Sequence, residues 1–342
     1  MTKEWTAESL RELALGYMPS AVLLAAAELD IYSVLAREPM HAERLAAALQ
    51  TDLRATTVLA DALVAVGVVE KFDTLYSPAP GIIDTLAADA TSRVLPLLQL
   101  HATRLRLWGR LAEVVKTGRP VAVAPSIRGA EADLVAYIET MEVNAWQAPQ
   151  VVAGLGPLEF EHLLDIGCGT GSWPIAFLRA VPGARATLYD LPEALPIARS
   201  RVEAAGLTDR VSFVEGDFTV DEALPGGADL ALVFGVAHQN SRQENRELFA
   251  KLHTALRPGG HILVRGNVMS PDHTAPLFGA MFAILMLVRT ESGTTYSFEE
   301  TVEDLAAAGF EEPKLFRHER DIDSIIRARR RDIQPGTGGA RR

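Results

Sequence analysis

A short glycine-rich turn constrains the fold of this chain more than any other feature of its sequence. The predicted strand Leu163–Ile166 ends at the turn, and Ser172–Ala180 after it has helical spacing. Between them stand Gly167, Gly169 and Gly171. Glycine lets the backbone turn tightly and approach a ligand, because it has no Cβ. The order strand, glycine turn, helix is typical of a ligand-binding doubly wound sheet.

The same alternation continues along the second half of the chain. Further runs with strand or helix patterning follow at 186–190, 194–205, 211–214, 230–236, 244–256 and 260–264. This alternation predicts an α/β fold with a parallel sheet and helices on both faces. Ligands of such sheets bind beyond the carboxyl ends of the strands. We therefore expect the chemistry from residues that end strands.

The first part of the chain has a different texture. A length of 342 residues predicts about two domains. Residues 1–90 are rich in Ala and Leu at helical spacing and end in a short hairpin pattern closed by Pro78, which is the order of a winged helix. We predict a winged-helix domain over 1–90, a connecting helical layer over 91–155, a catalytic sheet domain over 156–332 and a flexible tail over 333–342. The basic residues from Arg327 to Arg331 are also expected in a solvated, fraying end.

A winged helix suggests DNA binding, but the residues favour packing. The helix that would read bases, 55–65, is mostly apolar and carries Asp61. Reading DNA requires exposed Arg, Lys, Asn or Gln, and the chain has a formal charge of -11. We predict no nucleic-acid partner and a homodimer that covers the apolar helices. A DNA-binding regulator remains an alternative.

Composition bears on disulfides, metal sites and membrane association. The single cysteine, Cys168, excludes an internal disulfide framework. The eight histidines form no i, i+4 pair, so we predict no metal site. Charged residues interrupt the amino terminus, and the longest apolar run, Leu277–Val288, is too short to cross a bilayer. We expect a cytoplasmic protein without a membrane partner.

Acidic residues end three successive predicted strands. Asp165 stands two residues before the first glycine of the turn, Asp190 ends the second strand, and Asp217 with Phe218 follows the third. The turn is spaced G-x-G-x-G, whereas a dinucleotide fingerprint is G-x-G-x-x-G. A carboxylate at Asp165 would repel a pyrophosphate but suits a cationic ligand such as an amino acid or a sulfonium. This disfavours the alternative of a nicotinamide-dependent enzyme.

These motifs resemble the S-adenosylmethionine (SAM)-dependent small-molecule O-methyltransferases that have an N-terminal winged-helix dimerisation domain. The resemblance implies a class I methyltransferase fold, SAM as methyl donor and an aromatic secondary metabolite as acceptor. It implies that Gly167 and Gly169 hold the amino-acid part of SAM, Asp190 the ribose, and Asp217 with Phe218 the adenine. The residues that carry it are 164–171, 189–192, 209–211, 216–218, 256–260 and 306–310. The predicted cofactor-binding residues are Asp165, Gly167, Gly169, Asp190, Leu191, Asp217 and Phe218.

The resemblance also points to a catalytic histidine. The family ends its fourth strand in His-Asp-Trp, and this chain has His238-Gln239-Asn240. An imidazole suits the removal of a phenolic proton during methyl transfer. The glutamate that orients the histidine in the family is replaced by Gly266, and Glu291, Glu299 or Glu300 are candidates to supply a carboxylate instead. Because these partners are missing, C-methylation of an aromatic ring carbon is an alternative to O-methylation.

The acceptor pocket is predicted from apolar, adaptable side chains. The helical run 276–288 resembles a substrate-covering helix of bacterial family members and carries Met281, Phe282 and Met286. Met141 and Trp146 are further candidates, although simple core packing explains such residues equally well. The predicted pocket residues are Met141, Trp146, Met281 and Met286.

Overall fold

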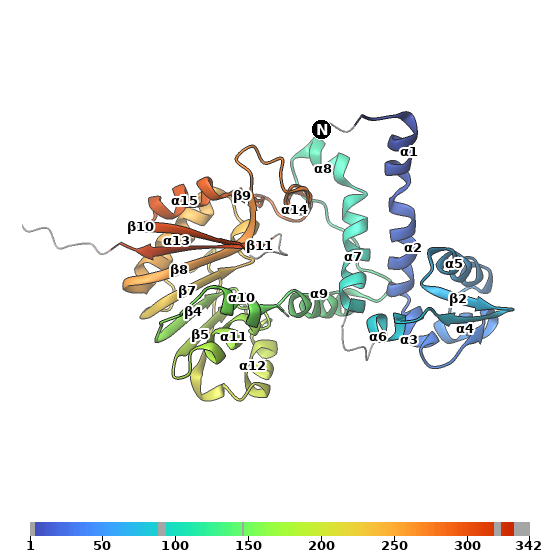
Figure 1. Ribbon diagram of the computed structural model, residues 1–342, viewed down its shortest axis with the longest axis horizontal. Coiled ribbons are helices and arrows are strands. Elements are labelled where there is room, and N and C mark those ends of the chain that lie inside the picture. The colour runs from blue at the N-terminus through green and yellow to red at the C-terminus, as the bar shows by residue number, and fades with distance from the viewer. Residues whose placement is uncertain (1–3, 88–93, 146, 318–322, 332–342) are drawn as a thin grey trace, which may run out of the picture. The chain divides into compact units, whose positions relative to one another are not determined.

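A computed structural model describes residues 4–87, 94–145, 147–317 and 323–331 (Figure 1). Its contacts divide the chain into two units. The first comprises Met1–Ala112 and Ala122–Asn144, and the second comprises Glu113–Val121 and Ala145–Arg342. The four-part division expected from the sequence stays a prediction.

The first unit is mainly helical and contains the expected order of helix, helix and hairpin. Helix α5 begins after Asp52, whose carboxylate caps it by accepting from the Ala55 N–H at 2.8 Å, and ends at Gly67 with φ of 88°. The three short strands pair antiparallel in the order β1-β3-β2. The elements are α1 Ala7–Leu15, α2 Tyr17–Glu28, α3 Ile31–Leu35, β1 Met40–His41, α4 Ala42–Leu49, α5 Leu53–Val66, β2 Val69–Phe72, β3 Leu75–Pro78, α6 Ile82–Leu86, α7 Val94–Trp108 and α9 Ala130–Asn144.

The start of this unit exposes apolar side chains. Helix α1 buries none of its residues, and its Leu13 is 66% exposed. Tyr17 and Met18 at the start of α2 are also exposed. Within the described residues, the stretch Ala7–Glu28 is the one helical segment whose length and composition would allow it to cross a membrane, a test that buried core helices and signal sequences also pass.

The second unit is built on a sheet with strand order β10-β11-β8-β7-β4-β5-β6. Strands β4 to β8 pair parallel, and β9 adds a short parallel pairing to β8. The strands are β4 His162–Ile166, β5 Arg185–Asp190, β6 Val211–Glu215, β7 Ala228–Phe234, β8 Leu256–Met269, β9 Tyr296–Ser297, β10 Phe310–Arg317 and β11 Asp323–Arg330. The helices are α8 Leu111–Thr117, α10 Ala148–Gly154, α11 Ser172–Ala180, α12 Leu195–Ala204, η1 Thr208–Arg210, η2 Ala237–Gln239, α13 Arg242–Ala255, α14 Leu277–Arg289 and α15 Phe298–Ala307.

Helices cover both faces of this sheet (Figure 1). On one face α10, α11 and α12 pack around Phe177 and Leu188, and on the other α13 and α15 pack around Phe249 and Leu305. The two cores are separate because alternate residues of each strand point to opposite faces. This arrangement confirms the predicted α/β class with a doubly wound sheet.

The carboxyl-terminal strands correct two expectations. Strands β10 and β11 run antiparallel to their neighbours, so the sheet is mixed rather than wholly parallel. The prediction of a fraying end from Arg327 was wrong, because β11 lies between β8 and β10 and buries Ile325, Ile326 and Ala328. The Arg327 guanidinium carbon stacks 5.3 Å from the centre of the Phe316 ring, so alternating arginines are compatible with a strand. The predicted tail over 333–342 lies outside the described residues.

Candidate active site

The glycine turn between β4 and α11 is a left-handed backbone segment. Gly167, Gly169 and Gly171 have φ values of 67°, 52° and 75°. A Cβ on Gly167 would lie 2.7 Å from Val236 Cγ2, whereas a Cβ on Gly169 would meet nothing within 4 Å. Gly167 is therefore required by close packing, and Gly169 leaves an open backbone surface.

Two side chains of the turn are buried beneath it. Asp165 is 2% exposed, and burial together with the nearby Asp190 raises the pKa of its carboxyl well above the usual value. Cys168 is also buried, and burial raises the pKa of its thiol. A thiol that stays protonated is a poor nucleophile, which agrees with a packing role for Cys168.

Asp190 links the turn to the end of the next strand. Its Oδ2 accepts from the Gly169 N–H at 2.7 Å, and its Oδ1 accepts from the Leu191 N–H at 2.8 Å. Leu191 is exposed. Since β4 and β5 are parallel neighbours, Asp190 and the turn share one edge of the sheet.

Asp217 and Phe218 follow β6, the next strand along this edge. Asp217 Oδ1 accepts from the Thr219 N–H at 2.8 Å and from its hydroxyl at 2.6 Å, and these bonds lower the pKa of Asp217. The Phe218 carbonyl accepts from Lys251 Nζ at 2.9 Å. The structure thus places Asp165 on β4, Asp190 on β5 and Asp217 just after β6, and these three are successive strands of the sheet.

His238 lies in η2, directly after β7. Its ring makes an edge-to-face contact with Phe282 of α14, with 4.8 Å between the ring centres. Nδ1 is buried and has no hydrogen-bond partner in the described part of the chain, although the side chain as a whole keeps partial exposure. The histidine is thus held by packing, and no carboxylate among the described residues orients Nδ1.

Burial is the main influence on the protonation of His238, and two arginines add to it. Burial first, and then Arg289 and Arg265, lower the pKa of His238 to about 4. Gly266 stands where the resembling family has a glutamate, and a Cβ added to it would meet nothing within 4 Å. The neighbouring Asn267 is buried, and its Oδ1 has no partner among the described residues.

Comparison with known proteins identifies the family. A model of the O-methyltransferase domain matches residues 131–311, and a model of the O-methyltransferase dimerisation domain matches 11–80. The chain is 30% identical over 306 residues to the tetracenomycin polyketide synthesis 8-O-methyl transferase TcmO of Streptomyces glaucescens, a match covering 87% of this chain and 90% of the relative. The chain belongs to the O-methyltransferase family.

Two further proteins are similar to this chain over most of its length. The 3-hydroxy-5-methyl-1-naphthoate 3-O-methyltransferase of Streptomyces sahachiroi is 27% identical over 319 residues, covering 90% of each chain. The structure of human N-acetylserotonin methyltransferase in complex with SAM matches with a TM-score of 0.80 at 25% identity, covering 97% of this chain and 100% of that one. The protein is a SAM-dependent methyltransferase with the class I fold, as the resemblance implied.

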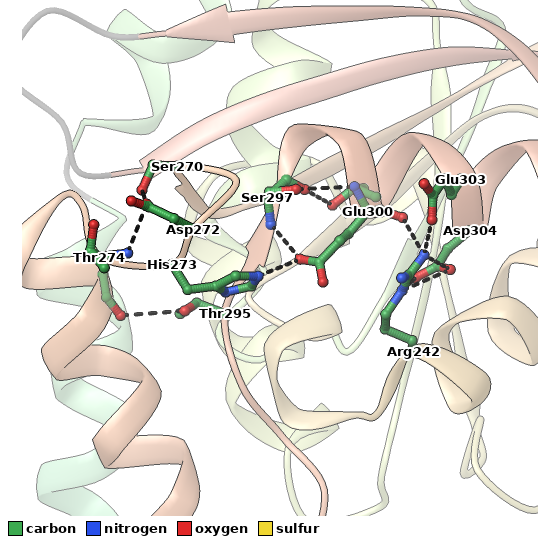
Figure 2. Close-up of polar contacts among 12 residues, drawn as sticks. Arg242, Ser270, Asp272, His273, Thr274, Thr295, Ser297, Glu300, Glu303 and Asp304 are labelled. Atoms are coloured by element: carbon green, nitrogen blue, oxygen red, sulfur yellow. Dashed lines mark hydrogen bonds and ion pairs between the residues drawn. The ribbon is translucent and has the colours of Figure 1, made fainter.

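The carboxylates considered as partners of His238 have other surroundings in the methyltransferase. Glu300 Oε2 accepts from the Ser297 N–H at 2.9 Å and pairs with His273 Nε2 at 3.1 Å (Figure 2). Glu291 and Glu299 are exposed. Glu300, one of the candidate partners of His238, is therefore bonded to Ser297 and His273 instead.

The buried Asp304, which the sequence did not single out, links α15 to α13. Asp304 of α15 is 2% exposed and accepts from Arg242 Nε at 3.0 Å and Arg246 Nε at 2.6 Å. Arg242 also donates to Glu303 at 2.8 Å (Figure 2). Arg242 is the first residue of α13, so the network ties α15 to the helix that follows η2. Its signal in the sequence was only charge complementarity between distant helices.

The predicted pocket residues have different environments. Met281 is 42% exposed, whereas Met286 is buried. Met141 is partly buried and belongs to the first unit, and Trp146 lies outside the described residues. Phe282, which contacts His238, also stacks on Phe278 with 6.1 Å between ring centres, so α14 presents aromatic rings beside the histidine.

Proposed function

We propose that this methyltransferase methylates a hydroxyl of an aromatic small molecule of the phenolic, polyketide or naphthoate type. The observation that carries the proposal is the position of His238, which lies in η2 after β7 and makes an edge-to-face contact with the ring of Phe282. The names of the tetracenomycin and naphthoate relatives support the substrate class. We place the reaction in cytoplasmic secondary metabolism, such as antibiotic biosynthesis.

The residues on the edge formed by β4, β5 and β6 fit SAM. The turn backbone at Gly167 and Gly169, of which Gly169 is open, is assigned together with Asp165 to the amino-acid part of the cofactor. Asp190 with Leu191 is assigned to the ribose, because a carboxylate that already accepts two N–H bonds retains further lone pairs for hydroxyls. Asp217 and Phe218 are assigned to the adenine.

The chemistry needs few protein groups. SAM supplies a methyl group on a positively charged sulfur, so transfer breaks a C–S bond and forms a C–O bond. The protein holds the two reactants in line. His238 is neutral near pH 7, because its pKa is about 4, and its Nε2 accepts the proton released from the acceptor hydroxyl.

Mutation of His238 tests this assignment. We expect His238→Ala to lower kcat by about 100-fold or more, the usual contribution of a general base. SAM affinity, measured by calorimetry, should stay unchanged, because the cofactor is assigned to other strands. Asp190→Ala is the matched variant that should weaken SAM binding. Unchanged turnover in His238→Ala would remove the histidine from the mechanism.

The low pKa of His238 also favours a second candidate, C-methylation of an electron-rich ring carbon. Such a reaction needs no strong base at the hydroxyl. An acceptor whose hydroxyl is capped as an ethyl ether separates the two. O-methylation is then blocked, and any methylated product with the ethyl group intact would support the alternative.

We further propose that the first unit is a winged-helix dimerisation domain that pairs two copies of the chain. The exposed apolar side chains of Leu10, Leu13, Tyr17 and Met18 need a cover of this kind. The match of residues 11–80 to the dimerisation domain supports it. Sedimentation of Leu13→Glu should show a monomer where the wild type is a dimer, and an unchanged dimer would place the interface elsewhere.

A further inference from the structure

Tyr189 of β5 stands directly before Asp190, the acid assigned to the ribose, and is itself buried. Its side chain is 1% exposed and packs in the core that also contains Phe249 of α13. Its backbone carbonyl accepts from the Gly167 N–H of the glycine turn at 2.9 Å. Tyr189 therefore contacts or adjoins two parts of the candidate cofactor site, but its buried side chain is not placed to bind a ligand itself.

The hydroxyl of Tyr189 reaches the loop that follows β6. It donates a hydrogen bond to Asp221 Oδ2, and the same oxygen accepts from the Asp217 N–H at 3.3 Å. Burial first, and then Asp221, raise the pKa of Tyr189, so its hydroxyl stays protonated and remains a donor. Asp221 thus joins the buried tyrosine to the backbone of Asp217, the residue assigned to the adenine.

Gly216 allows the loop to lie this close to the tyrosine. A Cβ on Gly216 would lie 2.5 Å from Asp221 Oδ2 and 2.5 Å from Tyr189 Cε2. The Gly216 N–H donates to the Asp190 carbonyl at 3.0 Å. The loop is therefore tied to β5 twice, by the Tyr189 side chain through Asp221 and by the Asp190 backbone.

Further hydrogen bonds fix the side of the loop that faces away from Tyr189. Asp217 Oδ1 accepts from the N–H and the hydroxyl of Thr219, and Lys251 of α13 donates to the Phe218 carbonyl at 2.9 Å. The Asp217 carboxylate is thus held in one direction. It retains lone pairs for a donor such as the exocyclic amine of adenine.

We propose that Tyr189 and Asp221 are positioning residues, which hold Asp217 in place for the exocyclic amine of adenine and so set the preference of the enzyme for an adenine nucleoside. This inference rests on the proposed assignment of Asp217 and Phe218 to the adenine and adds the residues that fix them. The pair acts through Asp217, because Tyr189 is buried and Asp221 Oδ2 already accepts from two donors. Without the tyrosine hydroxyl, Asp221 loses its tie to β5, and the Asp217 backbone loses a fixed acceptor.

Calorimetry of the full-length enzyme with two ligands tests the proposal. S-adenosylhomocysteine carries the amine, and S-inosylhomocysteine carries in its place a carbonyl oxygen, which cannot donate to a carboxylate. Tyr189→Phe removes only the hydroxyl, Asp221→Ala removes the shared acceptor, and Asp221→Asn keeps an oxygen that can accept. Asp217→Ala removes the group assigned to the amine. Tyr76→Phe is the matched control, because Tyr76 is also 1% exposed and donates to a carboxylate oxygen, Asp61 Oδ1, at 2.8 Å in the first unit.

We expect the wild type to bind S-adenosylhomocysteine about tenfold or more tightly than S-inosylhomocysteine, the effect of one hydrogen bond to a charged group. Asp217→Ala should abolish this preference. Tyr189→Phe and Asp221→Ala should each reduce the ratio of the two affinities by about threefold or more. Asp221→Asn should keep a larger part of the ratio than Asp221→Ala, and Tyr76→Phe should leave it unchanged.

A folded Tyr189→Phe protein that keeps the wild-type ratio would overturn the inference alone. Equal weakening of both ligands by Tyr189→Phe, or an equal fall of the ratio in Tyr76→Phe, would overturn it as well, since either result indicates a general loss of structure. If Tyr189→Phe does not fold, the same ratio in Asp221→Ala decides. A wild type without preference, or an Asp217→Ala variant that keeps it, would overturn the assignment of Asp217 to the adenine and the inference with it.

Discussion

The close contact between the glycine turn and Val236, which follows β7 and precedes the proposed catalytic residue His238, yields a quantitative prediction. Gly167 has φ of 67°, and a Cβ there would lie 2.7 Å from Val236 Cγ2. Val236 stands two residues before His238. A side chain at Gly167 must therefore push on the segment that positions the histidine, and the substitution to make is Gly167→Ala.

The magnitude follows from two separate costs. A left-handed φ costs a non-glycine residue roughly 1–2 kcal/mol. The overlap with Val236 adds about 1–3 kcal/mol of overpacking, so Gly167→Ala should lose about 2–5 kcal/mol of unfolding free energy. Gly169→Ala is the matched variant, because its φ is 52° and its Cβ would meet nothing within 4 Å. It should lose only the backbone cost, about 1–2 kcal/mol.

Urea unfolding of the wild type and four variants measures these values. The variants are Gly167→Ala, Gly169→Ala, Val236→Ala and the double variant Gly167→Ala with Val236→Ala. Removing the Val236 methyl groups should relieve the overlap, giving a favourable coupling free energy of about 1–3 kcal/mol in the double-mutant cycle. Equal losses in Gly167→Ala and Gly169→Ala, together with zero coupling to Val236, would refute the argument from close packing.

Three further predictions concern the site and its support. Because the pKa of His238 is lowered to about 4 from 6.5, the unfolded chain binds a proton more readily between these values, so stability falls as pH drops from 6.5 to 4. Between pH 6.5 and 4.5 this effect should lower the unfolding free energy by about 2 kcal/mol, so His238→Asn should lose about 2 kcal/mol less than the wild type; equal losses in both proteins, measured by urea unfolding, would contradict it. Gly266→Glu should raise the pKa of His238, because a nearby carboxylate favours the imidazolium, and an unchanged NMR titration would count against this. Asp304→Asn should cost about 2 kcal/mol of unfolding free energy by leaving Arg242 and Arg246 without their buried partner, whereas a change below about 0.5 kcal/mol would show that the network adds little.

The sequence predicted the central sheet well because local signals agree there. Apolar runs, a glycine turn and capping residues all indicate the same elements, as at Ser172–Ala180, which the structure reproduces as α11. The prediction for the carboxyl-terminal strand β11 was wrong because its local signals disagreed with its pairing in the sheet. Its arginines suggested a solvated end, and the pairing of β11 between β8 and β10 depends on partners more than fifty residues away along β8.

The positions of the candidate site residues in the sequence were predictable, but their contacts with distant segments were not. Strand-end positions placed His238 and the three acids, because parallel strands end at one edge of the sheet. Nothing local indicated that Phe282 would contact the ring of His238, since that contact depends on the packing of α14. The sequence did show that Gly266 carries no carboxylate, and the structure adds that a Cβ there would meet nothing within 4 Å.

The most direct measurement of the central claim is a screen of aromatic hydroxy acceptors with SAM labelled by ¹³C in its methyl group. The label in the product is then located by NMR. We predict an O-methyl carbon on an aromatic acceptor, formed by the wild type and lost in His238→Ala. A label on a ring carbon, or equal labelling by His238→Ala, would contradict histidine-assisted O-methylation.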